Sequence, residues 1–96
     1  MPSDHHFKIG GLRWLWRYTR LKGQAAGWAY LPDHKNPKLE RKVLIDSRLT
    51  RRQRLETECH EALHCCFPQM SEETITQAGA DLSRILWALG YRLKEE

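Results

Sequence analysis

The chain has 96 residues, of which 41% are hydrophobic, and its formal net charge at pH 7 is +4. This length favours a single domain over residues 1–96 with one modest core. Three cysteines, an odd number, are a poor framework for disulfide bonds, and no apolar run approaches the length of a membrane span. Because the polar stretch from Met1 to His6 does not resemble a signal peptide, we expect a cytoplasmic protein with reduced thiols and no membrane partner.

Residues 1–46 are expected to form a small antiparallel sheet. Gly10 and Gly11 interrupt the start of the chain, and turn-forming residues separate the segments that follow. Residues 32–37 read as a polar loop with proline at both ends. Segments rich in aromatic or branched residues favour strands, and three are predicted, at residues 13–21, 27–31 and 41–46.

Positive charge is concentrated in the first half of the chain. Residues 1–54 hold thirteen Lys or Arg against four Asp or Glu, a net charge of +9, whereas residues 55–96 carry −5. Clustered cations attract phosphates, and arginines interleaved with aromatic residues suit base stacking. Trp14, Trp16 and Tyr18 share one face of a strand, which is more typical of a core. Nucleic acid is therefore a possible partner of the basic half, and a solvated basic face is the simpler interpretation.

Two helices are predicted in the second half. The first covers residues 50–67, with Thr50 as N-cap and Gln53 completing a capping box. The second covers residues 71–90, with Ser71 as N-cap and Gly90 at its end. The second helix is expected to bury an apolar stripe made of Ile75, Ala78, Leu82, Ile85, Leu86 and Leu89. The predicted fold class is therefore α+β, a three-stranded sheet followed by two helices.

The first helix contains His60-Glu61-Ala62-Leu63-His64, which matches the pattern H-E-x-x-H. Histidines four residues apart lie on one helix face and can bind one zinc ion, while the glutamate stays close to a water at the metal. His60 and His64 are thus candidate zinc ligands and Glu61 a candidate general base. Two surface histidines on an amphipathic helix would give the same pattern.

A third protein ligand is needed, and no histidine follows His64. Glu72, Glu73 and Asp81 are the candidates, of which Asp81 and Glu73 are preferred and only one is expected to bind. Asp81 borders the predicted apolar stripe, where a carboxylate needs a cation or donor, and Glu73 has the longer reach. A closed structural site that adds Cys59 and Cys65 is a weaker alternative, because one helix cannot surround a tetrahedral ion.

The short sheet, the strand ending Val43-Leu44-Ile45-Asp46 and the H-E-x-x-H helix together resemble the minimal core of zincin metallopeptidases. The last 55 or so residues more closely resemble small H-E-x-x-H proteins common in phages and prophages, and more distantly SprT-like and ImmA/IrrE-like peptidases. The resemblance implies a peptide or protein substrate held by strand addition, with residues 42–46 as the candidate strand. It also implies a host-cytoplasmic location if the chain is phage-encoded.

Two functions follow from the sequence. The first is a zinc-dependent metallopeptidase, with His60, His64 and one carboxylate holding zinc and Glu61 as base. The second is a noncatalytic, metal-stabilised binding module of phage origin that contacts a host protein or nucleic acid.

Overall fold

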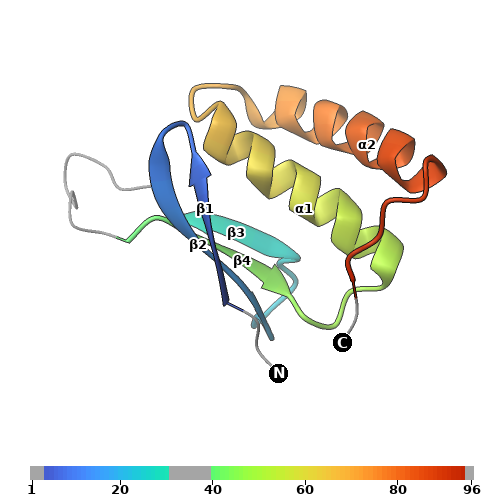
Figure 1. Cartoon of the computed structure of the whole chain (residues 1–96), viewed down its shortest axis with the longest axis horizontal. Helices are drawn as coiled ribbons and strands as arrows, with labels where there is room; N and C mark the ends of the chain where they lie inside the picture. The colour runs from blue at the N-terminus through green and yellow to red at the C-terminus, as the bar shows by residue number, and fades with distance from the viewer. Residues whose placement is uncertain (1–3, 31–39, 95–96) are drawn as a thin grey trace.

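The computed structural model describes residues 4–30 and 40–94, which fold into a mixed sheet followed by two helices (Figure 1). The α+β class predicted from the sequence is confirmed. None of the helices in this described part is long and apolar enough to cross a membrane. The elements are β1 (Asp4–Ile9), β2 (Leu12–Thr19), β3 (Gly27–Tyr30), β4 (Lys42–Asp46), α1 (Arg51–Cys66) and α2 (Glu72–Ala88).

The sheet begins with a hairpin that the sequence analysis missed. β1 pairs with β2 in antiparallel fashion through the turn at Gly10 and Gly11, whose φ angles are 62° and 77°. Two positive φ angles are what a tight two-residue hairpin turn requires, and glycine adopts them without steric cost. The two glycines therefore connect two strands instead of only interrupting the start of the chain.

The sheet is mixed and four-stranded, which corrects the prediction of three antiparallel strands. Its order is β1-β2-β4-β3, with β4 parallel to β2 and antiparallel to β3. β4 thus occupies the interior and β3 an edge of the described sheet. The polar loop predicted at residues 32–37 lies outside the described residues.

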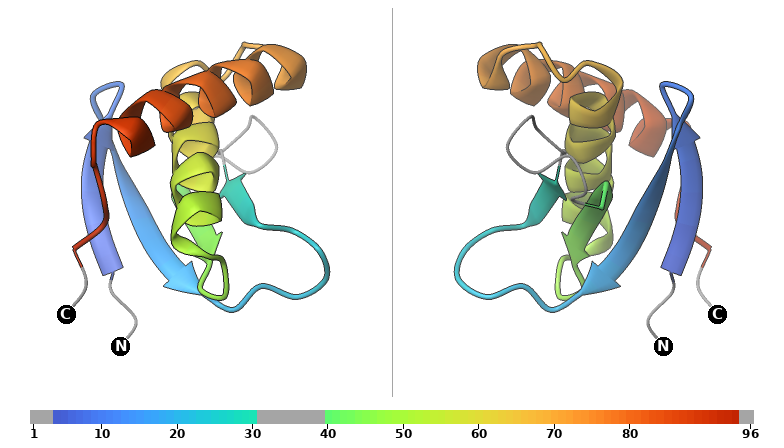
Figure 2. Two further views of the ribbon diagram at one scale, coloured as in Figure 1. Left: turned by 90° about the vertical axis from the view of Figure 1, so that its right-hand side faces the viewer. Right: turned by 90° about the vertical axis from the view of Figure 1, so that its left-hand side faces the viewer.

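The sheet, α1 and α2 form three successive layers (Figure 2). The sheet face toward α1 carries most of the buried core cluster, and Cys65 on α1 completes it. The hydroxyl of Tyr18 on β2 donates a hydrogen bond to Glu58 on α1 and accepts one from the indole N–H of Trp16 at 3.1 Å. The core members of the sheet are Trp14, Trp16, Val43 and Ile45.

Both helices begin where the sequence predicts. Thr50 caps α1 in a capping box with Gln53, so two backbone N–H groups that lack helical partners are satisfied. Ser71 caps α2 by accepting the backbone N–H of Thr74 at 3.2 Å. Gly90, with φ of 92°, follows the end of α2 in the left-handed conformation typical of helix ends.

The face that α2 turns toward α1 matches the predicted stripe only in part, at Ile75. Ile75, Gly79 and Ser83 are buried, whereas Leu82, Ile85 and Leu89 are exposed. A Cβ placed on Gly79 would lie 3.2 Å from the Cα of His60, so the two helices approach closely at this point. Gly79 and Ser83 therefore form the helix contact together with Ile75, and Leu82, Ile85 and Leu89 lie outside it.

Candidate metal centre

His60 and His64 project from the same face of α1, one turn apart. Their Nε2 atoms lie 3.2 Å from each other, and each side chain is 22% exposed. The i, i+4 spacing places both rings on one side of the helix. The two imidazoles thus present their nitrogens to one small volume between α1 and α2.

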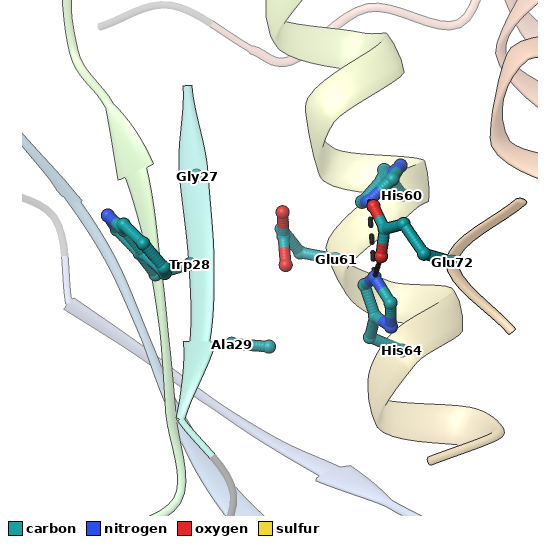
Figure 3. A pocket seen from close by; sticks show the side chains of 7 residues that line it. All are labelled: Gly27, Trp28, Ala29, His60, Glu61, His64 and Glu72. Carbon is teal, nitrogen blue, oxygen red and sulfur yellow. Dashed lines mark hydrogen bonds and ion pairs between the residues drawn. The ribbon is translucent and has the colours of Figure 1, made fainter. Parts of the chain in front are cut away.

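Glu72, the first residue of α2, brings a carboxylate to both histidines (Figure 3). One carboxylate oxygen lies 2.9 Å from Nε2 of His60, and the other lies 2.7 Å from Nε2 of His64. The three side chains form the group of possible metal ligands found among the described residues. One ligand atom from each residue lies within 4.8 Å of the others, so three donors from two helices converge.

The donor set and the distance between the two histidine nitrogens fit a zinc ion. Two histidines and one glutamate are a combination that catalytic zinc sites use, with the fourth position left to water or substrate. Two nitrogens that each lie about 2.0–2.1 Å from a tetrahedral zinc are about 3.3 Å apart. The 3.2 Å between the two Nε2 atoms is close to that value. The group can therefore hold a metal, although the metal's identity is not given by the ligands alone.

The two carboxylates preferred from the sequence lie elsewhere. Asp81 accepts hydrogen bonds from Gln77 at 3.1 Å and from Arg84 at 2.6 Å, and these contacts hold its pKa below the usual value. Glu73 and Asp81 both line a shallow surface depression on α2. The structure brings Glu72 to the histidines and leaves Glu73 and Asp81 outside the cluster.

Glu61 lies beside the cluster and is 7% exposed. Burial raises the pKa of its carboxyl, and the neighbouring imidazoles of His60 and His64 act in the opposite direction. Its side chain points from α1 toward β3, where Gly27 leaves room for it (Figure 3). A Cβ on Gly27 would lie 3.1 Å from the Cγ of Glu61 and 2.8 Å from the Cγ2 of Thr57, so α1 and β3 can be this close only because of the glycine.

A cleft of about 370 Å³ joins the cluster to the edge strand β3. Its described lining comes from β3, from the H-E-x-x-H segment and from Glu72. Residues 42–46, the strand expected to hold a substrate, are paired on both sides as β4 and have no free edge. β3, at the edge of the described sheet, is instead the strand that borders the cleft. The lining residues are Gly27, Trp28, Ala29, His60, Glu61, His64 and Glu72.

The backbone of β3 offers hydrogen-bonding groups at this edge. The N–H of Asp46 donates to the carbonyl of Ala26 at 2.8 Å, which fixes the phase of the antiparallel ladder. Because residues alternate between bonding inward and outward along such a ladder, Gly27 and Ala29 direct their N–H and C=O groups away from β4. These are the β3 residues beside the cleft where an extended chain could pair.

The cysteines play no part in the cluster. Cys59 and Cys65 are buried, and burial raises the pKa of both thiols, to about 12 for Cys65. Neither thiol belongs to the group of possible metal ligands found among the described residues. Among the described residues that line the cleft there is also no Tyr, Lys or Arg side chain to stabilise an oxyanion. Tyr91 follows the far end of α2.

Comparisons of the chain with models of protein families, with curated proteins and with solved structures find no match.

Proposed function

We propose that the protein is a small zinc-dependent metallopeptidase with a zincin-like core. The observation that carries this proposal is the convergence of His60, His64 and Glu72, with Glu61 beside them in a cleft bordered by an edge strand of the described sheet. Bound zinc lowers the pKa of a water to about 7 and polarises a carbonyl, which is the chemistry that peptide hydrolysis needs. The resemblance of the sequence to the minimal zincin core favours the same proposal.

Glu61 has the position and environment of a general base. It is adjacent in sequence to one ligand and three residues from the other, yet it points toward the cleft and belongs to no ion pair described in the structure. Burial raises its pKa toward the working pH, where a carboxylate accepts a proton more effectively. Its role is to take a proton from the attacking water and deliver it to the leaving amine.

The cleft suits an extended peptide. The outward backbone groups of Gly27 and Ala29 would pair with the substrate main chain, so an added strand would lie between β3 and the cluster. Main-chain pairing gives affinity without a strong demand on sequence. We therefore expect short, unfolded peptides to be better substrates than folded proteins.

The test is hydrolysis of a mixture of fluorogenic peptides by zinc-loaded protein, comparing the natural chain with Glu61→Gln. Removing a general base typically costs about 10²- to 10⁴-fold in rate. We expect the variant to bind zinc normally and to lose activity by about this factor. Equal rates for both proteins would contradict the proposal. Zinc binding without hydrolysis by the natural chain would instead indicate a noncatalytic, metal-stabilised binding module.

A further inference from the structure

A second candidate binding surface lies on the side of the sheet opposite the metal cluster. Gly27 faces α1, so the next residue, Trp28, points to the other side of the sheet (Figure 3). No helix in the described part of the chain covers this side (Figure 2). We call it the outer sheet face and define it by the side chains of Lys8, Arg13, Arg17, Trp28, Tyr30 and Lys42.

The strand register brings these residues together from all four strands. Trp28 on β3 is opposite Leu44 on β4, which in turn is opposite Arg17 on β2. Tyr30 is opposite Lys42 in the neighbouring row. Because directly opposed residues point to one side of a sheet, aromatic groups and cations share this surface.

Trp28 and Tyr30 provide the aromatic part. Trp28 is 50% exposed, and its ring lies 6.5 Å from that of Tyr30. The ammonium of Lys42 lies 5.1 Å from the centre of the Tyr30 ring. By contrast, Trp14 and Trp16, the residues that looked suited to base stacking in the sequence, are only 2% and 6% exposed in the core. Stacking surfaces are thus offered by β3, with a cation beside them.

The cations on this face are poorly balanced. Lys8 and Arg13 are directly opposite each other in the β1–β2 ladder, an arrangement of like charges that is destabilising. Arg17 is better balanced, because it pairs with Asp4 at 2.8 Å and Glu40 also interacts with it electrostatically. A polyanion laid across the face would relieve the repulsion between Lys8 and Arg13.

We propose that the outer sheet face binds single-stranded DNA, with bases stacked on Trp28 and Tyr30 and phosphates attracted by the surrounding cations. Stacking is available to every base, and phosphate attraction is independent of sequence, so little sequence preference is expected. Neither contact requires a 2′-hydroxyl group. In a duplex the base faces are already stacked on each other, so duplex DNA can use only the charges. Binding on this face is independent of the metal cluster and of the proposed peptidase activity.

The experiment measures the affinity of metal-free protein for a fluorescent single-stranded oligonucleotide of roughly 12 nucleotides. We expect Trp28→Ala to weaken binding by about 5- to 100-fold, the range for loss of one stacked base, and Trp28→Phe to retain most of it. Phe67→Ala is the control, because Phe67 is 51% exposed at the end of α1, away from the face. Glu61→Gln should bind like the natural chain, which separates this proposal from the peptidase.

Three results would overturn the proposal. The first is equal affinity of the natural chain and Trp28→Ala when circular dichroism shows that both are folded. The second is equally tight binding of duplex DNA and of the single strand, which would mean that stacking contributes nothing to the affinity. The third is displacement of the oligonucleotide by poly-glutamate at equal charge concentration, which would identify an acidic polypeptide as the partner instead.

Discussion

Glu72 and Glu73 are adjacent at the start of α2, yet they face different surroundings. Glu72 shares a helix face with Gly79 and Ser83, seven and eleven residues later, and this is the face in contact with α1. Glu73 is rotated by about 100° from it. A carboxylate at position 72 therefore reaches the histidines, whereas one at position 73 does not.

Zinc affinity should separate the three candidate carboxylates. We expect Glu72→Ala to weaken zinc binding by at least about 10- to 100-fold, the loss reported for groups that only orient ligands. Glu73→Ala is the matched control and should bind zinc like the natural chain, as should Asp81→Ala. Competition with a chromogenic chelator measures all three. A larger loss in either control than in Glu72→Ala would show that the ligand set is wrong.

Asp46 is a second residue whose neighbours change its properties, because Arg48 lowers the pKa of its carboxyl. It is 5% exposed at the end of β4 and accepts hydrogen bonds from the backbone N–H, Nε and Nη2 of Arg48. Arg48 also donates to the carbonyl of Leu21 at 2.8 Å. These contacts lower the pKa of Asp46 to about 2 and hold the turn that leads from β4 to α1.

The effect of Asp46 on stability should depend on pH. A carboxyl whose pKa is lower in the folded state stabilises the fold above its unfolded pKa, and the stabilisation is lost as the pH falls toward its folded pKa. We expect Asp46→Asn to cost about 1–3 kcal/mol at pH 7. That difference should shrink between about pH 5 and 2. Urea unfolding of both proteins across this range measures it, and a constant difference would contradict the assigned pKa.

At the scale of elements, the contact between α1 and α2 decides where Glu72 lies. Hydrophobic periodicity favours packing of α2 through Leu82, Ile85 and Leu89, and that orientation would turn Glu72 away from the histidines. Packing through Gly79 and Ser83 occurs instead, because small residues allow the two backbones to approach. Hydrophobic periodicity predicts the helix but not the face through which it packs, so it does not single out Glu72 among the candidate carboxylates.

Gly79→Ala tests this contact. The added methyl group would lie 3.2 Å from the Cα and 3.3 Å from the backbone N of His60, so α2 must shift by a few tenths of an ångström. We expect zinc affinity to fall by about 10-fold, as for other changes that disturb ligand orientation. Thr76→Ala, on the exposed side of α2, should leave affinity unchanged. Titration with zinc measures both, and unchanged affinity in Gly79→Ala would mean that the close approach does not position Glu72.

Other elements were predictable because their signals are local. The caps at Thr50 and Ser71 and the glycine at position 90 each act within a few residues, and the structure confirms them. β1 was missed because its sequence, Asp4–Ile9, lacks a run of strand-forming residues. The stronger signal was the pair Gly10-Gly11, since two glycines between extended segments favour a hairpin turn.

At the scale of the whole molecule, the order of the strands lay beyond local reasoning. β4 inserts between β2 and β3, and this depends on contacts distant in sequence, such as Trp16 opposite Val43. Chain order alone would place β3 next to β2, and β4 at the edge. This insertion leaves β3 at the edge of the described sheet, beside the cleft.

A bound metal would also join the two helices. A chain of 96 residues has a modest core, and a ligand that binds only the folded state stabilises it. At a free zinc concentration about 100 times the Kd, the gain is about 2.7 kcal/mol. This corresponds to a rise in Tm of roughly 10–20 °C for a domain of this size. Thermal unfolding with zinc and with a chelator measures the rise, and Glu72→Ala should show much less of it.

Binding of one metal ion by His60, His64 and Glu72 can be observed directly. The most direct test is a crystal structure of the zinc-loaded protein with anomalous diffraction recorded at the zinc edge. We expect one strong peak per chain, between the Nε2 atoms of the two histidines and the Glu72 carboxylate. A peak at Asp81 or Glu73, or none in a correctly folded chain, would contradict it.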